Sequence, residues 1–222
     1  MKAVLILDCE TSGLAPTDRV VEVGAVLWSV VNRTVVAAYS SLVDGPGNGA
    51  HAINGIPPAS LTEGADEASV WERLSRWLGR ADALVAHNAE FDRGHTPPGW
   101  DTGKPWICTM SDIEWPMHSS SKSLTAMMLA HGLGVSHAHR ALTDCMGIAR
   151  LLERCSDMGH DVEDMLRQGT RPKALYRALV SYNEKDKARA CGFSWNATSK
   201  IWTKKIAIEN AGAFPFQVER VA

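Results

Sequence analysis

The chain has 222 residues, of which 45% are hydrophobic, and a formal net charge of -2 at pH 7. That length accommodates one domain with a full hydrophobic core and a small additional unit. No apolar run approaches the roughly 18 residues required to span a membrane, and no signal pattern is present; the five cysteines, an odd number without a Cys-x-x-Cys pair, suggest neither a disulfide framework nor a zinc knuckle, so we expect a cytoplasmic protein.

The first part of the chain predicts three strands followed by a loop. Residues 3–8 form a short apolar run rich in branched side chains, which is typical of a buried strand that reaches its polar end at Asp8. Residues 20–30 and 33–43 are rich in valine and predict a hairpin beside the first strand. Residues 45–64 are rich in glycine and proline, which indicates a loop.

The following residues predict alternating helices and strands. Apolar side chains recur at helical spacing in residues 66–78, so this helix should pack one face on the sheet. The other predicted elements are strands at 83–86 and 106–109 and helices at 123–131 and 141–155. This order predicts an α/β domain with a mixed sheet, antiparallel where hairpins join strands and parallel where helices cross over.

Asp8 and Glu10 form the first acidic motif. Successive side chains of a strand point to opposite faces, so these two project to one side while Cys9 points to the other. Unpaired, the two carboxylates repel each other, and a divalent cation with hard oxygen ligands is the simplest relief. An isolated Asp-x-Glu is more often a solvated strand end, so the motif needs further support.

Two further acidic motifs supply that support. Asp92 closes the sequence His-Asn-Ala-Glu-Phe-Asp at a junction of strand and short helix, where a side chain can point to the edge of a sheet. Asp144 lies on the first turn of an apolar helix, and His139 comes just before that helix. Three acidic motifs in one short chain predict a single metal-binding cluster.

These motifs resemble those of the DEDDh, or DnaQ-like, family of 3'-to-5' exonucleases. The family's first motif matches residues 8–14, its second matches residues 87–92, and its third, His-x-Ala-x-x-Asp, matches residues 139–144. The likeness covers roughly residues 1–157. It implies an exonuclease domain of residues 1–160 with an RNase H-like fold and a five-stranded mixed sheet.

Other residues indicate the branch of the family and one departure from it. Residues 106–110 and the Trp-Pro pair at 115–116 resemble the exonuclease X branch. Many relatives continue the helix beyond the second-motif Asp, whereas Gly94 and a following pair of prolines shorten it here. The shape of the substrate groove therefore does not follow from the resemblance.

The expected reaction is metal-dependent hydrolysis of a phosphodiester. Because the phosphate is negatively charged, cations are needed to neutralise it and to generate the nucleophile. We expect two ions, Mg²⁺ or Mn²⁺, about 4 Å apart, with Asp8 bridging them. Glu10 and Asp144 are expected on the nucleophile side, and Asp92 is expected to support the other ion through water. His139 is the expected general base, because imidazole ordinarily titrates near cellular pH.

Three other histidines are rivals for roles near the site. His137 lacks the five-residue offset to Asp144 that the family motif requires, so we predict that it is a loop residue. His87 and His51 are predicted to be structural or substrate-contacting rather than catalytic.

Substrate contacts are expected from the first two motifs. Backbone amides and hydroxyls of Thr11, Ser12 and Gly13 are candidates for holding the terminal 3'-hydroxyl, and Leu14 for wedging against the last base. Without the resemblance, Thr-Ser-Gly is more often only a turn. Asn88 and Phe91 are also candidates for lining the groove, although Phe91 fits an ordinary core position equally well.

Residues 167–222 predict a small basic α+β module. They carry 11 basic and 4 acidic side chains, whereas residues 1–166 carry 12 and 21. We predict a short helix starting near Pro172, a second helix ending near Gly192, and a hairpin with aromatic residues and lysines at 193–203. A Lys/Arg-x-x-Gly-Phe-x-Trp pattern resembles a module attached to several DNA-processing enzymes.

Two interpretations of this module stay open. Aromatic rings beside lysines stack bases and track the backbone of single strands, which suggests that it engages DNA near the active site. Alternatively, Trp195 and Trp202 form the core of a module this small.

The leading hypothesis is a 3'-to-5' exonuclease on DNA that releases nucleoside 5'-monophosphates, in a setting of repair, proofreading or phage-type DNA metabolism. Replication or repair proteins are its expected partners, and no membrane is expected. An exoribonuclease that trims RNA or short oligonucleotides is the alternative, because nothing in the motifs reads a 2'-hydroxyl. A binding or polymerase-associated proofreading module with incidental hydrolysis is the third hypothesis. The sequence does not give the oligomeric state.

Overall fold

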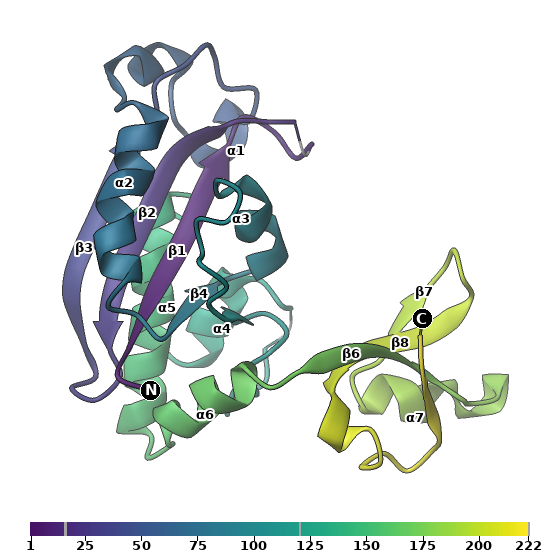
Figure 1. The fold of residues 1–222 in the computed structure, drawn as a ribbon. Helices are drawn as coiled ribbons and strands as arrows, with labels where there is room; N and C mark the ends of the chain where they lie inside the picture. Colours follow the sequence, from purple (N-terminus) through teal and green to yellow (C-terminus); the bar gives the residue numbers. More distant parts are fainter. Residues whose placement is uncertain (16, 120, 222) are drawn as a thin grey trace. The chain divides into compact units, whose positions relative to one another are not determined.

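The computed structural model describes residues 1–15, 17–119 and 121–221. The chain divides into two compact units, Met1–Thr170 and Arg171–Ala222 (Figure 1).

The first unit is built on the predicted five-stranded mixed sheet. Its strands are β1 (Ala3–Thr11), β2 (Val20–Ser29), β3 (Thr34–Leu42), β4 (Ala83–Ala86) and β5 (Trp106–Cys108). They lie in the order β3-β2-β1-β4-β5. The pairs β1–β2 and β2–β3 are antiparallel, and β1–β4 and β4–β5 are parallel. The fold prediction is therefore confirmed.

The helices of this unit connect the strands and cover the sheet. They are α1 (His51–Asn54), α2 (Glu67–Leu78), α3 (Ala89–His95), α4 (Leu124–Ala130), α5 (Ala141–Asp157) and α6 (Val162–Gly169), with a 3₁₀ helix at Pro58–Glu63. The helices α2, α4 and α5 are the ones that apolar spacing predicts. The segment predicted as a loop at 45–64 contains α1 and the 3₁₀ helix, and α6 is not predicted. No described helix has the length and apolar character to cross a membrane.

Alternation along β1 decides which side chains face the site. Leu5, Leu7 and Cys9 pack in the core that includes α2, whereas Val4 and Ile6 pack in the core that includes α5. Figure 1 shows these two helices on opposite faces of the sheet. Since side chains two residues apart share a face, Asp8 and Glu10 project toward the side that α5 covers.

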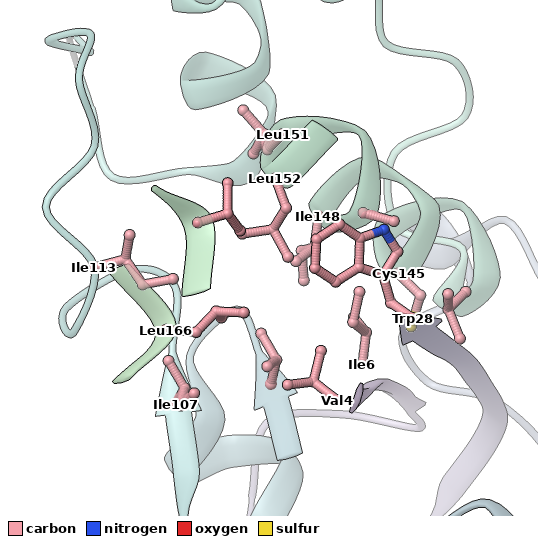
Figure 2. Packing of buried hydrophobic residues seen from close by; sticks show 14 of the residues in the cluster. Val4, Ile6, Trp28, Ile107, Ile113, Cys145, Ile148, Leu151, Leu152 and Leu166 are labelled. Carbon is pink, nitrogen blue, oxygen red and sulfur yellow. The ribbon is translucent and has the colours of Figure 1, made fainter. Parts of the chain in front are cut away.

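Helix α5 is anchored by an apolar face. Its residues Cys145, Ile148, Leu151 and Leu152 are buried in one cluster with Trp28 of β2 (Figure 2). Val4 and Ile6 of β1 and Ile107 of β5 belong to the same cluster. Each fully buried aliphatic side chain contributes roughly 1.5–3 kcal/mol to folding. The packing therefore fixes the N-terminal turn of α5 over β1 and β2.

The second unit is a small four-stranded antiparallel sheet with one short helix. Its elements are β6 (Lys173–Ala178), a 3₁₀ helix at Tyr182–Glu184, α7 (Lys185–Ala190), β7 (Ser194–Asn196), β8 (Ile201–Ala207), a 3₁₀ helix at Ile208–Asn210 and β9 (Val218–Arg220). The strand order is β7-β8-β6-β9. The hairpin predicted at 193–203 is present as β7 and β8, and the helix predicted before Gly192 is present as α7.

The helix predicted after Pro172 is wrong, because this segment is strand β6. Its buried side chains alternate, with Ala174, Tyr176 and Ala178 in the core of the module and Leu175 exposed. The apolar residues 175, 179 and 180 suggest helical spacing in the sequence, but the period of two in Ala174, Tyr176 and Ala178 determines the structure.

Candidate active site

One cavity of about 690 Å³ gathers every residue that the sequence predicts as catalytic or substrate-binding. Its lining includes Asp8, Glu10, Thr11, Ser12, Gly13, Leu14, Asn88, Phe91, Asp92, His139 and Asp144. These residues come from β1 and the turn after it, from α3, and from the N-terminal end of α5. The volume lies within the roughly 300–1,000 Å³ typical of small-ligand pockets.

The two carboxylates of β1 are half-buried and lie close to other acids. Burial raises the pKa of Asp8 well above its ordinary value, and the charges of Asp92, Asp144 and Glu10 raise it further. Burial also raises the pKa of Glu10 to about 7, with Asp144 as the next contributor. Both side chains are thus held in a site where their own negative charge is costly.

Asp92 reaches the cavity from α3, which follows β4. Its side chain is 1% exposed, and its Oδ1 accepts a hydrogen bond of 3.0 Å from the backbone N–H of Cys9. Burial raises the pKa of Asp92 to about 8, against the effect of that hydrogen bond. Asn88, the residue before α3, adopts a left-handed backbone with φ of 73°, which Asn tolerates better than most side chains. This turn directs α3 and its carboxylate toward β1.

Asp144 and His139 lie together at the start of α5. The backbone N–H of His139 donates to Oδ2 of Asp144 at 3.2 Å, and His139 has a left-handed φ of 65°. Burial raises the pKa of Asp144, while its hydrogen bond from His139 opposes that effect. Ligand atoms of Glu10, His139 and Asp144 lie within 4.8 Å of one another. Among the described residues this group of three excludes Asp8 and Asp92, which line the same cavity.

The side chains present fit divalent cations. Carboxylate oxygens are the ligands preferred by hard cations, and the imidazole beside them binds transition metals such as zinc. The raised pKa values of Asp8, Glu10, Asp92 and Asp144 share a cause, which is burial together with like charges. A bound cation removes this cost, so the donor set matches the cofactor that the motifs predict.

Two residues of β2 that the sequence reasoning missed hold the end of α5 in place. Glu22 is 2% exposed, and its carboxylate accepts bonds from Arg140 Nε at 3.0 Å, from Arg140 Nη2 at 2.8 Å and from the backbone N–H of Ala141 at 3.0 Å. A Cβ on Gly24 would lie 2.3 Å from the backbone of Ala141 and Leu142. A lone acid and a glycine within an apolar strand are the signal that could have identified both.

The turn after β1 uses its hydroxyls internally. Thr11 Oγ1 donates to the carbonyl of Gly13 at 2.6 Å, and Ser12 Oγ donates to Asp18 at 3.1 Å. These bonds shape the turn, and the backbone N–H of Ser12 is also engaged, because it donates to the carbonyl of Arg19 at 2.9 Å. Leu14 is 83% exposed and lines the cavity, a position that matches its predicted contact with a base.

His87 braces the site. Its Nδ1 lies 2.9 Å from Thr109 Oγ1, and its Nε2 lies 2.9 Å from the backbone carbonyl of Lys122. A carbonyl can only accept, so Nε2 carries a proton, and burial lowers the pKa of His87. The ring therefore ties the end of β4 to β5 and to the segment before α4, which supports the predicted structural role.

Further lining residues were not predicted. They are Gly49, Ala50 and Ile53 of the segment around α1, Ser123, Leu124 and Thr125 at the start of α4, and Cys9 and Ala138. His87, which the sequence predicts to be structural or substrate-contacting, also lines the cavity. The signal for the first group is the sequence Asn54-Gly55, since Gly55 ends α1 in a left-handed conformation. Phe91 lines the cavity and is half-buried, and its ring packs on His95 with ring centroids 4.5 Å apart.

An acidic cluster beside a mixed five-stranded sheet is the arrangement of RNase H-like nucleases, and the comparisons agree. Residues 5–98 match the family model described as Exonuclease. The solved structure of exonuclease X in complex with 5' overhanging duplex DNA is 30% identical, with a TM-score of 0.57, and the match covers 75% of this chain and 99% of that one. The chain therefore belongs to the DEDDh family of 3'-to-5' exonucleases, which are hydrolases that use divalent metals.

More distant structures share the fold. The zinc-bound form of the exonuclease I complex with single-stranded DNA from E. coli is 18% identical, with a TM-score of 0.62, over 85% of this chain and 50% of that one. A 3'-exonuclease that recognises a histone mRNA stem-loop is 16% identical, with a TM-score of 0.59, over 71% and 83%. Residues 174–221 match a domain of unknown function (DUF8626). A search of curated protein sequences finds no match.

Proposed function

We propose that the chain hydrolyses DNA from its 3' end and releases nucleoside 5'-monophosphates. The observation that carries this proposal is the single cavity lined by four carboxylates and His139 in a member of a 3'-to-5' exonuclease family. Two divalent cations, Mg²⁺ or Mn²⁺, are the proposed cofactors.

The choice of DNA over RNA rests on the comparisons. The relative at 30% identity, exonuclease X, is solved with duplex DNA and is matched over nearly its whole length. The relative that recognises an mRNA stem-loop is only 16% identical, which supports the fold and not the substrate. Trimming of RNA is therefore the second candidate, favoured only by the absence of a 2'-hydroxyl contact in the motifs.

In this proposal the carboxylates hold the cofactors. Asp8 and Glu10 from β1, Asp144 from α5 and Asp92 from α3 line one cavity. Bound cations would neutralise the scissile phosphate and make water a stronger nucleophile. The buried position of Asp92 and its bond from Cys9 keep that carboxylate directed at β1 before substrate arrives.

His139 is the proposed general base. It is exposed at the mouth of the cavity, and its backbone is held by Asp144. An imidazole nitrogen that faces the attacking water can accept its proton and release it to solvent. The carboxylates of Glu10 and Asp144 nearby stabilise the positive charge that the ring then carries.

The remaining side chains position the 3' end. The backbone of the turn at Thr11, Ser12 and Gly13 is proposed to contact the terminal sugar, and exposed Leu14 is proposed to contact the last base. Asn88 and Phe91 face the same cavity from the start of α3 and are proposed to line the path of the strand.

The test uses 5'-labelled single-stranded DNA, duplex DNA and RNA of one sequence, with Mg²⁺, with Mn²⁺ and with chelator. The proposal expects a ladder that shortens from the 3' end, faster on DNA, only with metal, and absent in Asp8→Asn. Cleavage from the 5' end, faster cleavage of RNA, or an undiminished rate in chelator would contradict it. Chromatography of the products distinguishes 5'-monophosphates from 3'-monophosphates.

A further inference from the structure

The second unit has its own pocket, which shares no lining residue with the cavity of the carboxylate cluster. The pocket has a volume of about 450 Å³ and lies entirely within residues 180–202. Its walls come from the 3₁₀ helix after β6, from α7, and from the β7–β8 hairpin, elements that Figure 1 shows in green to yellow.

Aromatic rings form one part of this pocket and are open to solvent. Trp195 and Trp202 are directly paired across β7 and β8, with ring centroids 5.5 Å apart. Trp195 is 51% exposed and Tyr182 is 80% exposed. The core of the unit is formed instead by Ala174, Tyr176, Ala178, Ala188, Phe193 and Ile206, with Trp202 packed at its edge. The interpretation of both tryptophans as core is therefore wrong for Trp195.

Cations form the other part. Lys185 Nζ lies 4.1 Å from the centroid of the Tyr182 ring, and Arg189 Cζ lies 5.7 Å from that of Trp202. Lys200 stands exposed at the hairpin turn. Within the described residues, Lys185 and Lys200 enter no ion pair, and Arg189 pairs with exposed Asp186 at 3.4 Å, a contact of little energy.

This combination has one ligand chemistry that suits both parts. Exposed aromatic faces offer a stacking surface for a flat ring, and cations beside them attract a phosphate. Other ligands suit only one part of the pocket or neither. In a duplex the base faces are stacked on each other, an acidic peptide lacks a flat ring beside each charge, and the cations repel a basic peptide. Residues 171–222 carry 10 basic and 4 acidic side chains, so the charge of the whole unit favours the same ligand.

We propose that this pocket binds single-stranded nucleic acid, stacking an unpaired base on Trp195 and contacting adjacent phosphates through Lys185 and Lys200. The module would then hold the unpaired part of a strand through a site of its own. The inference does not depend on hydrolysis by the first unit, because none of the residues involved belongs to the carboxylate cluster.

The test is designed to exclude binding at the exonuclease site. A circular, fluorescently labelled oligo(dT) has no 3' end, and chelator removes the metal, so retention of this probe by the full chain reports on other sites. Its affinity is measured at several salt concentrations, and linear oligo(U) is tested in parallel. A blunt duplex and a poly-Glu peptide of similar charge serve as competitors.

Three variants and one control test the pocket. Trp195→Ala should weaken binding of the circle roughly tenfold, and Trp195→Phe should retain most of it. Lys185→Gln combined with Lys200→Gln should weaken binding and flatten the slope of log K against log salt by about 1.4, since each phosphate contact on a single strand contributes about 0.7. Lys187→Gln is the matched control, because that exposed lysine pairs with Glu184 and does not line the pocket.

Several results would overturn the inference. One is equal affinity of Trp195→Ala, Lys187→Gln and the unsubstituted chain for the circle. Another is displacement of the circle by blunt duplex or poly-Glu at equal concentration of charges, which indicates a general anion site. If circular dichroism shows that Trp195→Ala disturbs the module, the lysine double variant decides, because Lys200 is exposed at a turn. Loss of exonuclease activity leaves every one of these measurements valid.

Discussion

Replacing Gly24 by alanine tests whether the position of α5 controls the reaction. The added Cβ would lie 2.3 Å from the carbonyl carbon of Ala141 and from the nitrogen of Leu142, where ordinary contacts begin near 3.4 Å. The atoms it meets are backbone, so no side chain can rotate away. The N-terminal turn of α5 must therefore move from β2 by roughly 1 Å, which carries Asp144 away from β1.

The expected effect on rate is larger than the effect on stability. A misplacement of about 1 Å at a catalytic group costs roughly 100-fold in rate. Overpacking of a core typically costs about 1–3 kcal/mol, which for a chain of this size lowers Tm by roughly 2–12 °C. Gly24→Ala should therefore be folded at 25 °C and nearly inactive. Cleavage of labelled DNA at saturating substrate and Mg²⁺, together with calorimetry, measures both quantities.

The matched control is Gly94→Ala, on the helix that carries Asp92. A Cβ there meets nothing within 4 Å, and the position is helical, so stability should be equal or higher and the rate nearly unchanged. The reasoning is refuted if Gly24→Ala retains its rate within about threefold, or if both variants lose activity to the same extent.

Three further predictions concern the residues around the cluster. His139→Ala should slow cleavage about 100- to 10,000-fold without lowering Tm, whereas His137→Ala, at an exposed position, should leave the rate within twofold. Equal cleavage rates of the two variants would rule out His139 as the general base. Glu22→Gln should lower the free energy of unfolding by about 1–3 kcal/mol in urea titrations, because a buried charged acceptor of Arg140 is lost, and an unchanged midpoint would contradict this. In chelator, Tm should fall as pH rises from 5 to 8. The pKa of Asp92 is about 8 in the folded chain and about 4 in the unfolded chain, so over this range the unfolded chain ionises Asp92 and the folded chain does not, which favours unfolding. Added Mg²⁺ should reverse that fall, and Asp92→Asn should make Tm depend less on pH. A Tm independent of pH would show that ionising the buried carboxylates does not destabilise the folded chain.

Local patterns predicted most of the first unit because its central strands are apolar runs and its main helices each have one apolar face. Apolar runs and helical spacing identified β1 to β5 and the main helices, and the three motifs identified the four acids and His139 that line the cavity. Short elements such as α1 and α6 escaped, since a helix of few residues shows too little periodicity. Strand β6 was mistaken for a helix because its alternation is carried by two alanines and Tyr176.

The supporting residues of the site required the structure. Glu22 and Gly24 have no motif, and their role exists only because α5 crosses the face of β2 on which they lie. The exposure of Trp195 also depends on which face of the hairpin the core of the module occupies. Sequence patterns gave the chemistry of the chain, whereas these long-range contacts depend on packing between distant segments. The roles of the individual site residues stay predictions until the variants are measured.

The position of Asp144 on α5 has a consequence for the chain during its synthesis on the ribosome. Strand β1 with Asp8 and Glu10 and helix α3 with Asp92 emerge first. The last acid and His139 arrive only with helix α5, which completes the apolar cluster. Because that helix must leave the exit tunnel before it can dock, a nascent or prematurely terminated chain lacks the complete set of ligands. The nuclease would thus become competent only when its own synthesis has passed most of the first unit, which delays its reactivity toward nearby nucleic acid.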